Sequence, residues 1–144
     1  MIKTGDSLTK EVTLSFDEDP KSVFVIRQLN FADLNNVEKE TGAPPNKAFA
    51  LTPTKNVKNK DGEDVSVYDF AQSSDNDFFE IVSFSARRDL AIVKSGLVSI
   101  DGNQVNPDLV VKWLNTIKPA SDVDKIVREL SDNIWKFSNE DPKA

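Results

Sequence analysis

The chain has 144 residues, of which 38% are hydrophobic and 29% charged, a composition that suits one globular domain and argues against a wholly disordered chain. It contains no cysteine and no histidine, which excludes disulfides and zinc–thiolate sites and removes the commonest general base. Its net charge of −6 argues against nucleic acid as a partner, because binding to phosphates needs an excess of Lys and Arg.

These properties favour a protein that binds other proteins over an enzyme, so we predict no catalytic residues and no cofactor. No apolar run approaches the ~20 residues that span a bilayer, so we predict no membrane segment. Charges interrupt every apolar stretch of residues 1–20, and we therefore predict no signal peptide. A cytoplasmic location is the simplest expectation.

The N-terminal part of the chain has the pattern of antiparallel strands. Val12, Leu14 and Phe16 alternate with polar residues, as in a strand with one buried face. Residues 17–21 have turn composition, and residues 22–29 are rich in β-branched and aromatic side chains. We expect a hairpin that packs on other elements, because two strands alone are marginally stable.

A short helix is predicted to follow. Asn30 suits its N-cap and Asp33 its first turn. Gly42 is placed to end it, since Pro44 follows closely and forbids its continuation. The predicted apolar face consists of residues spaced three apart: Phe31, Leu34 and Val37.

Residues 43–75 are the least regular part, and two interpretations stay open. In one, Lys47–Thr52 and Val65–Phe70 are strands on either side of the turn Asn59–Gly62, in which Asp-Gly is a hairpin signal. In the other, the whole segment is a mobile loop. A loop of this length within a compact domain is a candidate contact region.

The most apolar segment comes next and predicts the central helix. Ser74 and Asp77 resemble a capping box, and the helix should end near Ser95 and Gly96. A stripe at helical spacing comprises Phe78, Val82, Ala86, Leu90 and Val93. Further apolar residues widen it: Phe79, Ile81, Phe84 and Ile92. Such a wide stripe suggests contacts on more than one side of the helix.

Two more helices are predicted toward the C-terminus. Residues 101–103 form a tight turn, after which Asn106 caps a helix with Pro107 at its first position. Its predicted buried stripe comprises Leu109, Val110, Trp113, Leu114 and Ile117, and Pro119 stops it. Ser121 and Asp124 are expected to start the last helix. Its stripe comprises Val123, Ile126, Val127, Leu130, Ile134 and Phe137.

Together these elements predict an α+β fold that is mainly helical, with an N-terminal antiparallel β-hairpin packed on about four helices. We expect a single domain over residues 1–138, which includes the irregular segment 43–75. Residues 139–144 are expected to form a flexible polar tail.

Three charged clusters are candidate sites for metal or phosphate binding. Carboxylates bind hard cations such as calcium, but Asp17–Asp19 is more typical of a charged turn. Asp61–Asp64 lacks the alternating acids and terminal glutamate of an EF-hand loop, so we predict no metal site. Arg87–Asp89 lies inside a predicted helix, without the helix N-terminus that phosphate binding uses, and we interpret it as an ion-paired helix edge.

The two tryptophans lead to different expectations. Trp113 fits its helical stripe and is predicted to be core. Trp135 lies near the chain end, where it either packs at the edge of the core or serves as an interface anchor, a role that large aromatics favour. The predicted partner-binding residues are Phe79, Ile81, Phe84, Ile92, Trp135 and Phe137.

Three stretches carry a resemblance to a known family. They are Phe24–Leu34, Ala91–Gly102 and Ile117–Ser121, the last followed by a helix with Val123, Ile126, Glu129 and Leu130. On these stretches the chain resembles the tail assembly chaperones of long-tailed, lambda-type bacteriophages. Residues 43–75 have no counterpart in the resemblance.

The resemblance implies a protein that is needed to build the phage tail yet is absent from the virion. Such a chaperone binds and solubilises the tape-measure protein, helps to recruit tail-tube subunits, and acts in the host cytoplasm. We also expect self-association. Many of these families make a longer product by frameshifting, and Asp141–Lys143 allows a slippery heptamer if its codons are GAC CCA AAA. The nucleotide sequence decides this point.

Other functions stay open. One is a structural tail or connector subunit that remains in a phage-like particle. Another is an acidic inhibitor that mimics nucleic acid, although here acids and lysines are mixed along the chain. A carboxylate-based enzyme ranks last. A tail-tube gene upstream and a long tape-measure gene downstream would discriminate in favour of the chaperone.

Overall fold

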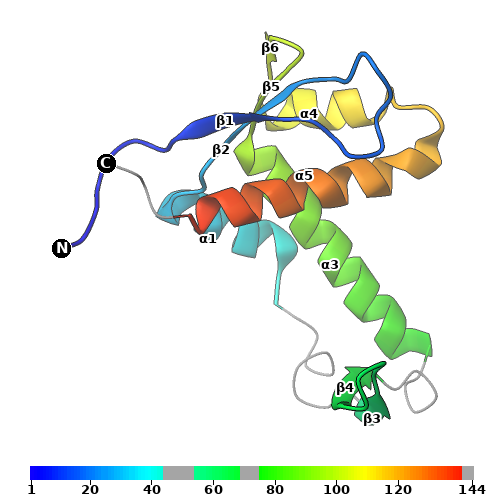
Figure 1. Ribbon diagram of the computed structural model, residues 1–144. Helices are drawn as coiled ribbons and strands as arrows, with labels where there is room; N and C mark the ends of the chain where they lie inside the picture. The colour runs from blue at the N-terminus through cyan, green and yellow to red at the C-terminus, as the bar shows by residue number, and fades with distance from the viewer. Residues whose placement is uncertain (44–53, 69–74, 141–144) are drawn as a thin grey trace. The chain divides into compact units, whose positions relative to one another are not determined.

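A computed structural model describes residues 1–43, 54–68 and 75–140 (Figure 1). Its contacts group into two compact units. We call Met1–Thr41 with Ala86–Ala144 the core unit, and Gly42–Ser85 the hairpin unit. The single domain expected over residues 1–138 stays a prediction.

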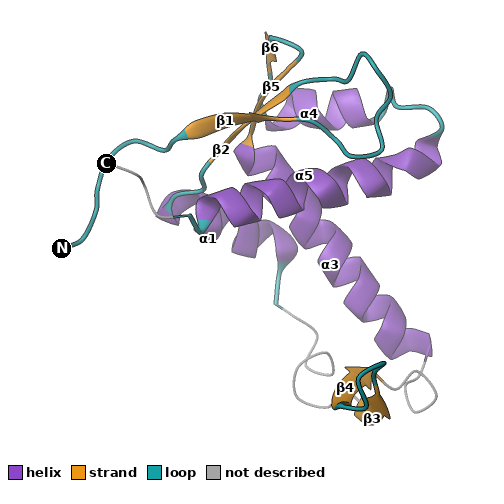
Figure 2. Ribbon diagram, in the orientation of Figure 1, coloured by secondary structure: helices purple, strands orange, loops and turns teal. Residues whose placement is uncertain are grey.

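The core unit contains a four-stranded antiparallel sheet in the order β1-β2-β5-β6 (Figure 2). Its strands are β1 (Thr9–Val12), β2 (Phe24–Arg27), β5 (Leu97–Ile100) and β6 (Asn103–Gln104). The helices of the described residues are α1 (Phe31–Thr41), α3 (Asp75–Gly96), α4 (Pro107–Leu114) and α5 (Val123–Ser138). The predicted α+β class, mainly helical with an N-terminal antiparallel hairpin, is therefore confirmed.

The first strand lies earlier than predicted. β1 ends at Val12, which pairs with Phe24 at the start of β2, so the ladder cannot extend to Phe16. Leu14 is buried nonetheless, and the N–H of Ser15 donates to Glu129 Oε1 at 2.9 Å. The alternating pattern here belongs to a loop that inserts one apolar side chain into the core. Periodicity alone does not distinguish such a loop from a strand.

Helix α1 begins and ends as predicted. The N–H of Asp33 donates to Asn30 Oδ1, and the N–H of Asn30 donates to Asp33 Oδ2, both at 2.9 Å, which forms a reciprocal capping box. Gly42 follows the helix with a φ of +80°, a conformation that glycine adopts without strain. The predicted apolar face is only partly covered, because Val37 is buried whereas Phe31 is 80% and Leu34 36% exposed.

Helix α3 ends at Gly96, as predicted, but its apolar stripe is not uniformly buried. The consecutive residues Ala91, Ile92 and Val93 are all buried, so the chain surrounds the helix there. Val82, earlier on the predicted stripe, is 50% exposed. The cap residue Ser74 lies outside the described residues. After β5, Asp101 and Gly102 have φ values of +49° and +84°, which gives the predicted tight turn.

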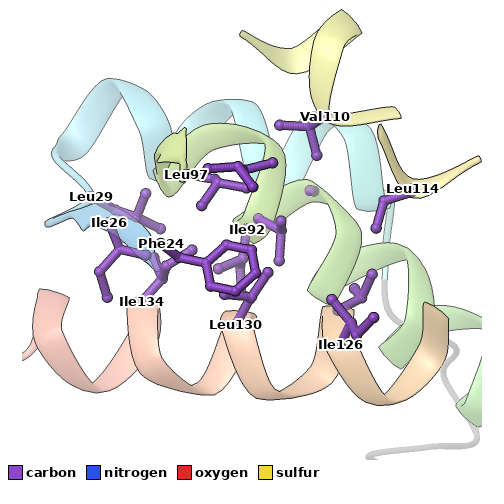
Figure 3. Packing of buried hydrophobic residues seen from close by; sticks show 14 of the residues in the cluster. Phe24, Ile26, Leu29, Ile92, Leu97, Val110, Leu114, Ile126, Leu130 and Ile134 are labelled. Carbon is purple, nitrogen blue, oxygen red and sulfur yellow. The ribbon is translucent and has the colours of Figure 1, made fainter. Parts of the chain in front are cut away.

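The two C-terminal helices complete the core. Asn106 caps α4 by accepting a bond from the N–H of Leu109 at 2.9 Å, as predicted. The start of α5 differs from the prediction, because a 3₁₀ turn over Ala120–Asp122 precedes Val123. Figure 3 shows the buried side chains of α5 directed toward β2 and α3, among them Ile126, Leu130 and Ile134. Ser138 ends the helix, and residues 141–144 lie outside the described part.

In the hairpin unit, β3 (Thr54–Lys58) pairs with β4 (Asp64–Tyr68). Asn59 organises the turn between them, since its Oδ1 accepts from the N–H groups of Asp61 and Glu63 at 3.0 Å each. The hairpin interpretation is confirmed around the expected turn, with the first strand at 54–58. Lys47–Thr52, the segment predicted as that strand, lies outside the described residues.

Candidate interaction surfaces

Two predicted partner-binding residues belong to the hydrophobic core. Ile92 is 0% and Phe137 5% exposed. Figure 3 shows Ile92 among the buried side chains. The backbone of Phe137 is also held, because Gln28 Nε2 donates to its carbonyl oxygen at 3.1 Å. Contacts within the chain therefore account for both side chains, and neither offers a surface to a partner in this structure. The sequence pattern gave them the same apolar periodicity as surface residues, so it could not separate the two cases.

Trp135 lies at the surface with a fixed neighbour. Its side chain is 39% exposed, and the guanidinium carbon of Arg88 stands 4.6 Å from the centroid of its ring. A cation over an indole face is attracted by the ring quadrupole, which restrains both side chains. The chain thus presents one partly exposed indole in a defined orientation, a property of interface anchors. Trp113 instead packs edge-on against Phe24, with ring centroids 5.6 Å apart, as expected of a core residue.

The described contacts of Arg87–Asp89 connect α3 to other helices, and the predicted ion pairing of this segment stays a prediction. Arg87 Nε donates to the carbonyl oxygen of Thr41 at 3.4 Å. Asp89 Oδ1 accepts from the hydroxyl of Ser131 at 2.8 Å, and Ser131 is buried. Together with Arg88 on Trp135, these contacts join α3 to α1 and α5. The segment is therefore a structural junction that also positions the exposed indole.

The remaining predicted residues lie on the N-terminal part of α3. Phe84 is half-buried. Phe79 and Ile81 belong to the helix by their backbone, but their side chains lie outside what the structure describes. The partner-binding prediction for these three residues stays a prediction.

Sequence reasoning missed an exposed apolar pair on α1. Phe31 and Leu34 are three residues apart, so they share one helix face, and they are 80% and 36% exposed. Arg27 holds the start of this helix, because its Nη1 and Nη2 donate to Asp33 at 2.6 and 2.8 Å. The sequence does contain a sign of this surface, a phenylalanine directly after the cap residue Asn30. Only the tertiary structure shows that no described part of the chain covers that side chain.

The charge on Asp33 contributes to this arrangement. Partial burial acts to raise the pKa of Asp33, but bonds from the Arg27 guanidinium and the Asn30 N–H, with the positive charge of Arg27, outweigh it and lower the pKa. Asp33 therefore stays ionised and bonds both the cap and β2. Phe31, between Asn30 and Asp33, is accordingly held in place at the helix start.

Phe31 and Trp135 lie toward the same end of the core unit. The N–H of Leu29 donates to Ser138 Oγ at 2.9 Å, which joins the start of α1 to the end of α5. Phe31 follows Leu29 by two residues, and Trp135 precedes Ser138 by three. We call Phe31, Leu34 and Trp135 the aromatic end of the core unit.

The acidic turn near the N-terminus has a structural explanation. Asp17 Oδ1 accepts from the N–H of Glu18 at 3.0 Å, and its Oδ2 accepts from the N–H of Ser22 at 2.8 Å. Within the described residues, no group of three acidic, histidine or cysteine side chains is arranged to hold a metal ion. Nor does any described helix have the length and apolar character needed to cross a membrane.

No protein-family model, curated protein or solved structure matches this chain.

Proposed function

We propose that this protein is a non-enzymatic phage tail assembly chaperone of the host cytoplasm, which binds and solubilises the tape-measure protein and helps to recruit tail-tube subunits. The resemblance of three sequence stretches suggests the class. The observation that carries the proposal is the aromatic end of the core unit, where Phe31 is 80% and Trp135 39% exposed on well-anchored helices.

The physical argument concerns how a chaperone holds an apolar chain. Covering exposed aromatic side chains with a partner lowers the free energy of the complex. A few such residues supply most of the affinity of an interface. A helical partner segment presents its apolar side chains at i, i+3, i+4 and i+7, which suits a surface of separated aromatic anchors. The net charge of −6 then helps to keep the complex in solution.

Co-expression with a fragment of the tape-measure protein tests the proposal. The wild-type chain should raise the soluble fraction of the fragment, and Trp135→Ala combined with Phe31→Ser should abolish most of that gain. Val111→Ser is the matched control, because Val111 is 38% exposed on α4 and lies outside the aromatic end. It should solubilise the fragment as the wild type does.

Two results would contradict the proposal. One is a wild-type chain that leaves the solubility of the fragment unchanged. The other is stoichiometric recovery of the protein from purified virions, which would favour a structural tail or connector subunit.

A further inference from the structure

Among the residues that the structure describes, β3 and β4 form a sheet of two strands (Figure 2). Isolated two-stranded sheets are marginally stable in water, and a free strand edge is a template for pairing with another strand. Val57 and Val65 lie opposite each other on one face and are each 39% exposed. The hairpin therefore offers apolar surface and backbone groups that pair with no other described strand.

The register of the hairpin makes its two edges complementary. The N–H of Asn59 donates to the carbonyl oxygen of Glu63 at 3.0 Å, so this pair is hydrogen-bonded. Hydrogen-bonded pairs alternate along an antiparallel ladder, and the backbone groups of Val57 and Val65 therefore point toward each other, between the two strands. The backbone groups of Lys58 then face the outer edge of β3, and those of Asp64 face the outer edge of β4. If β3 of one copy pairs with β4 of another in the same register, Lys58 lies opposite Asp64 across the new contact.

The charges favour this contact over other pairings. A lysine opposite an aspartate stabilises a pair of antiparallel strands, whereas like charges destabilise it. A two-fold contact joins β3 to β3 or β4 to β4, and so it never places Lys58 opposite Asp64. Only head-to-tail pairing gives the charge match, and it also places Val57 beside Val65 of the next copy.

The edge of the other sheet is protected differently. β1 is an edge strand, and its Lys10 lies opposite the fully buried Ile26. The ammonium group of Lys10 stands 5.0 Å from the ring centroid of Phe137 and 3.8 Å from Glu140 Oε1. A charged side chain on the inner face of an edge strand discourages pairing with a further strand. In the β3–β4 hairpin, by contrast, the positively charged Lys58 lies at the edge of β3 and the negatively charged Asp64 at the edge of β4.

We propose that copies of this protein associate head to tail through the β3–β4 hairpin, with β3 of one copy pairing with β4 of the next. Contacts of this kind generate rings when the rotation closes and open chains when it does not. This inference goes beyond the proposed function and does not depend on it, since it requires copies of this chain alone.

Sedimentation velocity over a concentration series tests the pairing. The wild type should associate, and Lys58→Glu or Asp64→Lys alone should raise the dissociation constant about tenfold by placing like charges across the contact. An equimolar mixture of the two variants should regain association, because the changed side chains then meet with opposite charges. Within each variant chain the 58–64 pair stays like-charged, so recovery cannot come from repair of the hairpin itself.

Two further samples sharpen the test. Lys60→Glu and Asp61→Lys change the charge by the same amounts in the turn, away from the strand edges, and should associate as the wild type does. The double exchange Lys58→Glu with Asp64→Lys in one chain restores both pairings and should also associate. A monomeric wild type, single variants that associate as tightly as the wild type, or a mixture no better than its components would each overturn the proposal.

Discussion

Gly96 is the position where the structure makes its sharpest prediction. It is the last residue of α3, and a Cβ added there would lie 2.6 Å from Cγ2 and 2.9 Å from Cδ1 of Ile134. Ile134 is fully buried, and its β-branched side chain has little freedom to rotate away. Gly96→Ala should therefore force α3 and α5 apart locally.

The magnitude follows from two opposing terms. Overpacking a well-filled core costs about 1–3 kcal/mol. Replacing glycine by alanine raises the free energy of unfolding by about 0.4–1 kcal/mol, chiefly because it restricts the unfolded chain. We expect Gly96→Ala to lower the free energy of unfolding by about 1–2 kcal/mol. Ile134→Ala removes the atoms that the new methyl group meets, so in that background Gly96→Ala should become neutral or stabilising.

Urea unfolding followed by tryptophan fluorescence measures this effect, because both tryptophans, Trp113 and Trp135, lie in the core unit. Ser95→Ala, at the neighbouring position in α3, is the control because it introduces alanine without adding a heavy atom to the helix. The double-mutant cycle should give a coupling of about 1–3 kcal/mol. A stabilising Gly96→Ala in the wild-type background, or costs that add within about 0.5 kcal/mol, would refute the close-approach argument.

Three further predictions concern the helix starts. Asn106→Ala removes the bond from the Leu109 N–H and should lower the free energy of unfolding by about 1 kcal/mol, whereas Asn106→Asp should lower it less. An unchanged urea midpoint for the alanine variant would count against the cap. Because the folded-state pKa of Asp33 is lowered, its stabilisation is fully present above the unfolded-state value of about 3.9 and is lost as the pH falls through the lower folded-state value. Unfolding free energies measured from pH 6 downward should therefore fall more steeply below about pH 4 in the wild type than in Asp33→Asn, and parallel curves would contradict this linkage. Phe31→Ser should change the unfolding free energy by less than about 0.5 kcal/mol because the side chain is 80% exposed, and a larger loss would show that it packs on its own chain.

Local signals in the sequence determined much of this fold. The caps at Asn30 and Asn106 and the turn at Asp101-Gly102 were predicted at the positions where the structure has them. Each depends on bonds or backbone angles within a few residues, so the local sequence is sufficient to specify it. The buried stripe of α5 was also predicted, because helical periodicity over sixteen residues leaves one continuous apolar face.

Burial that depends on another element was decided only by the tertiary structure. Phe31, Leu34 and Val37 have the same spacing, yet only Val37 is buried. Ile92 and Phe137 resembled candidate surface residues by pattern but lie in the core, whereas Trp135, on the same helix as Phe137, stays partly exposed beneath Arg88. Periodicity specifies which face of an element is apolar, but whether that face meets the core or solvent depends on which distant segment lies opposite, and that choice belongs to the packing of the whole unit.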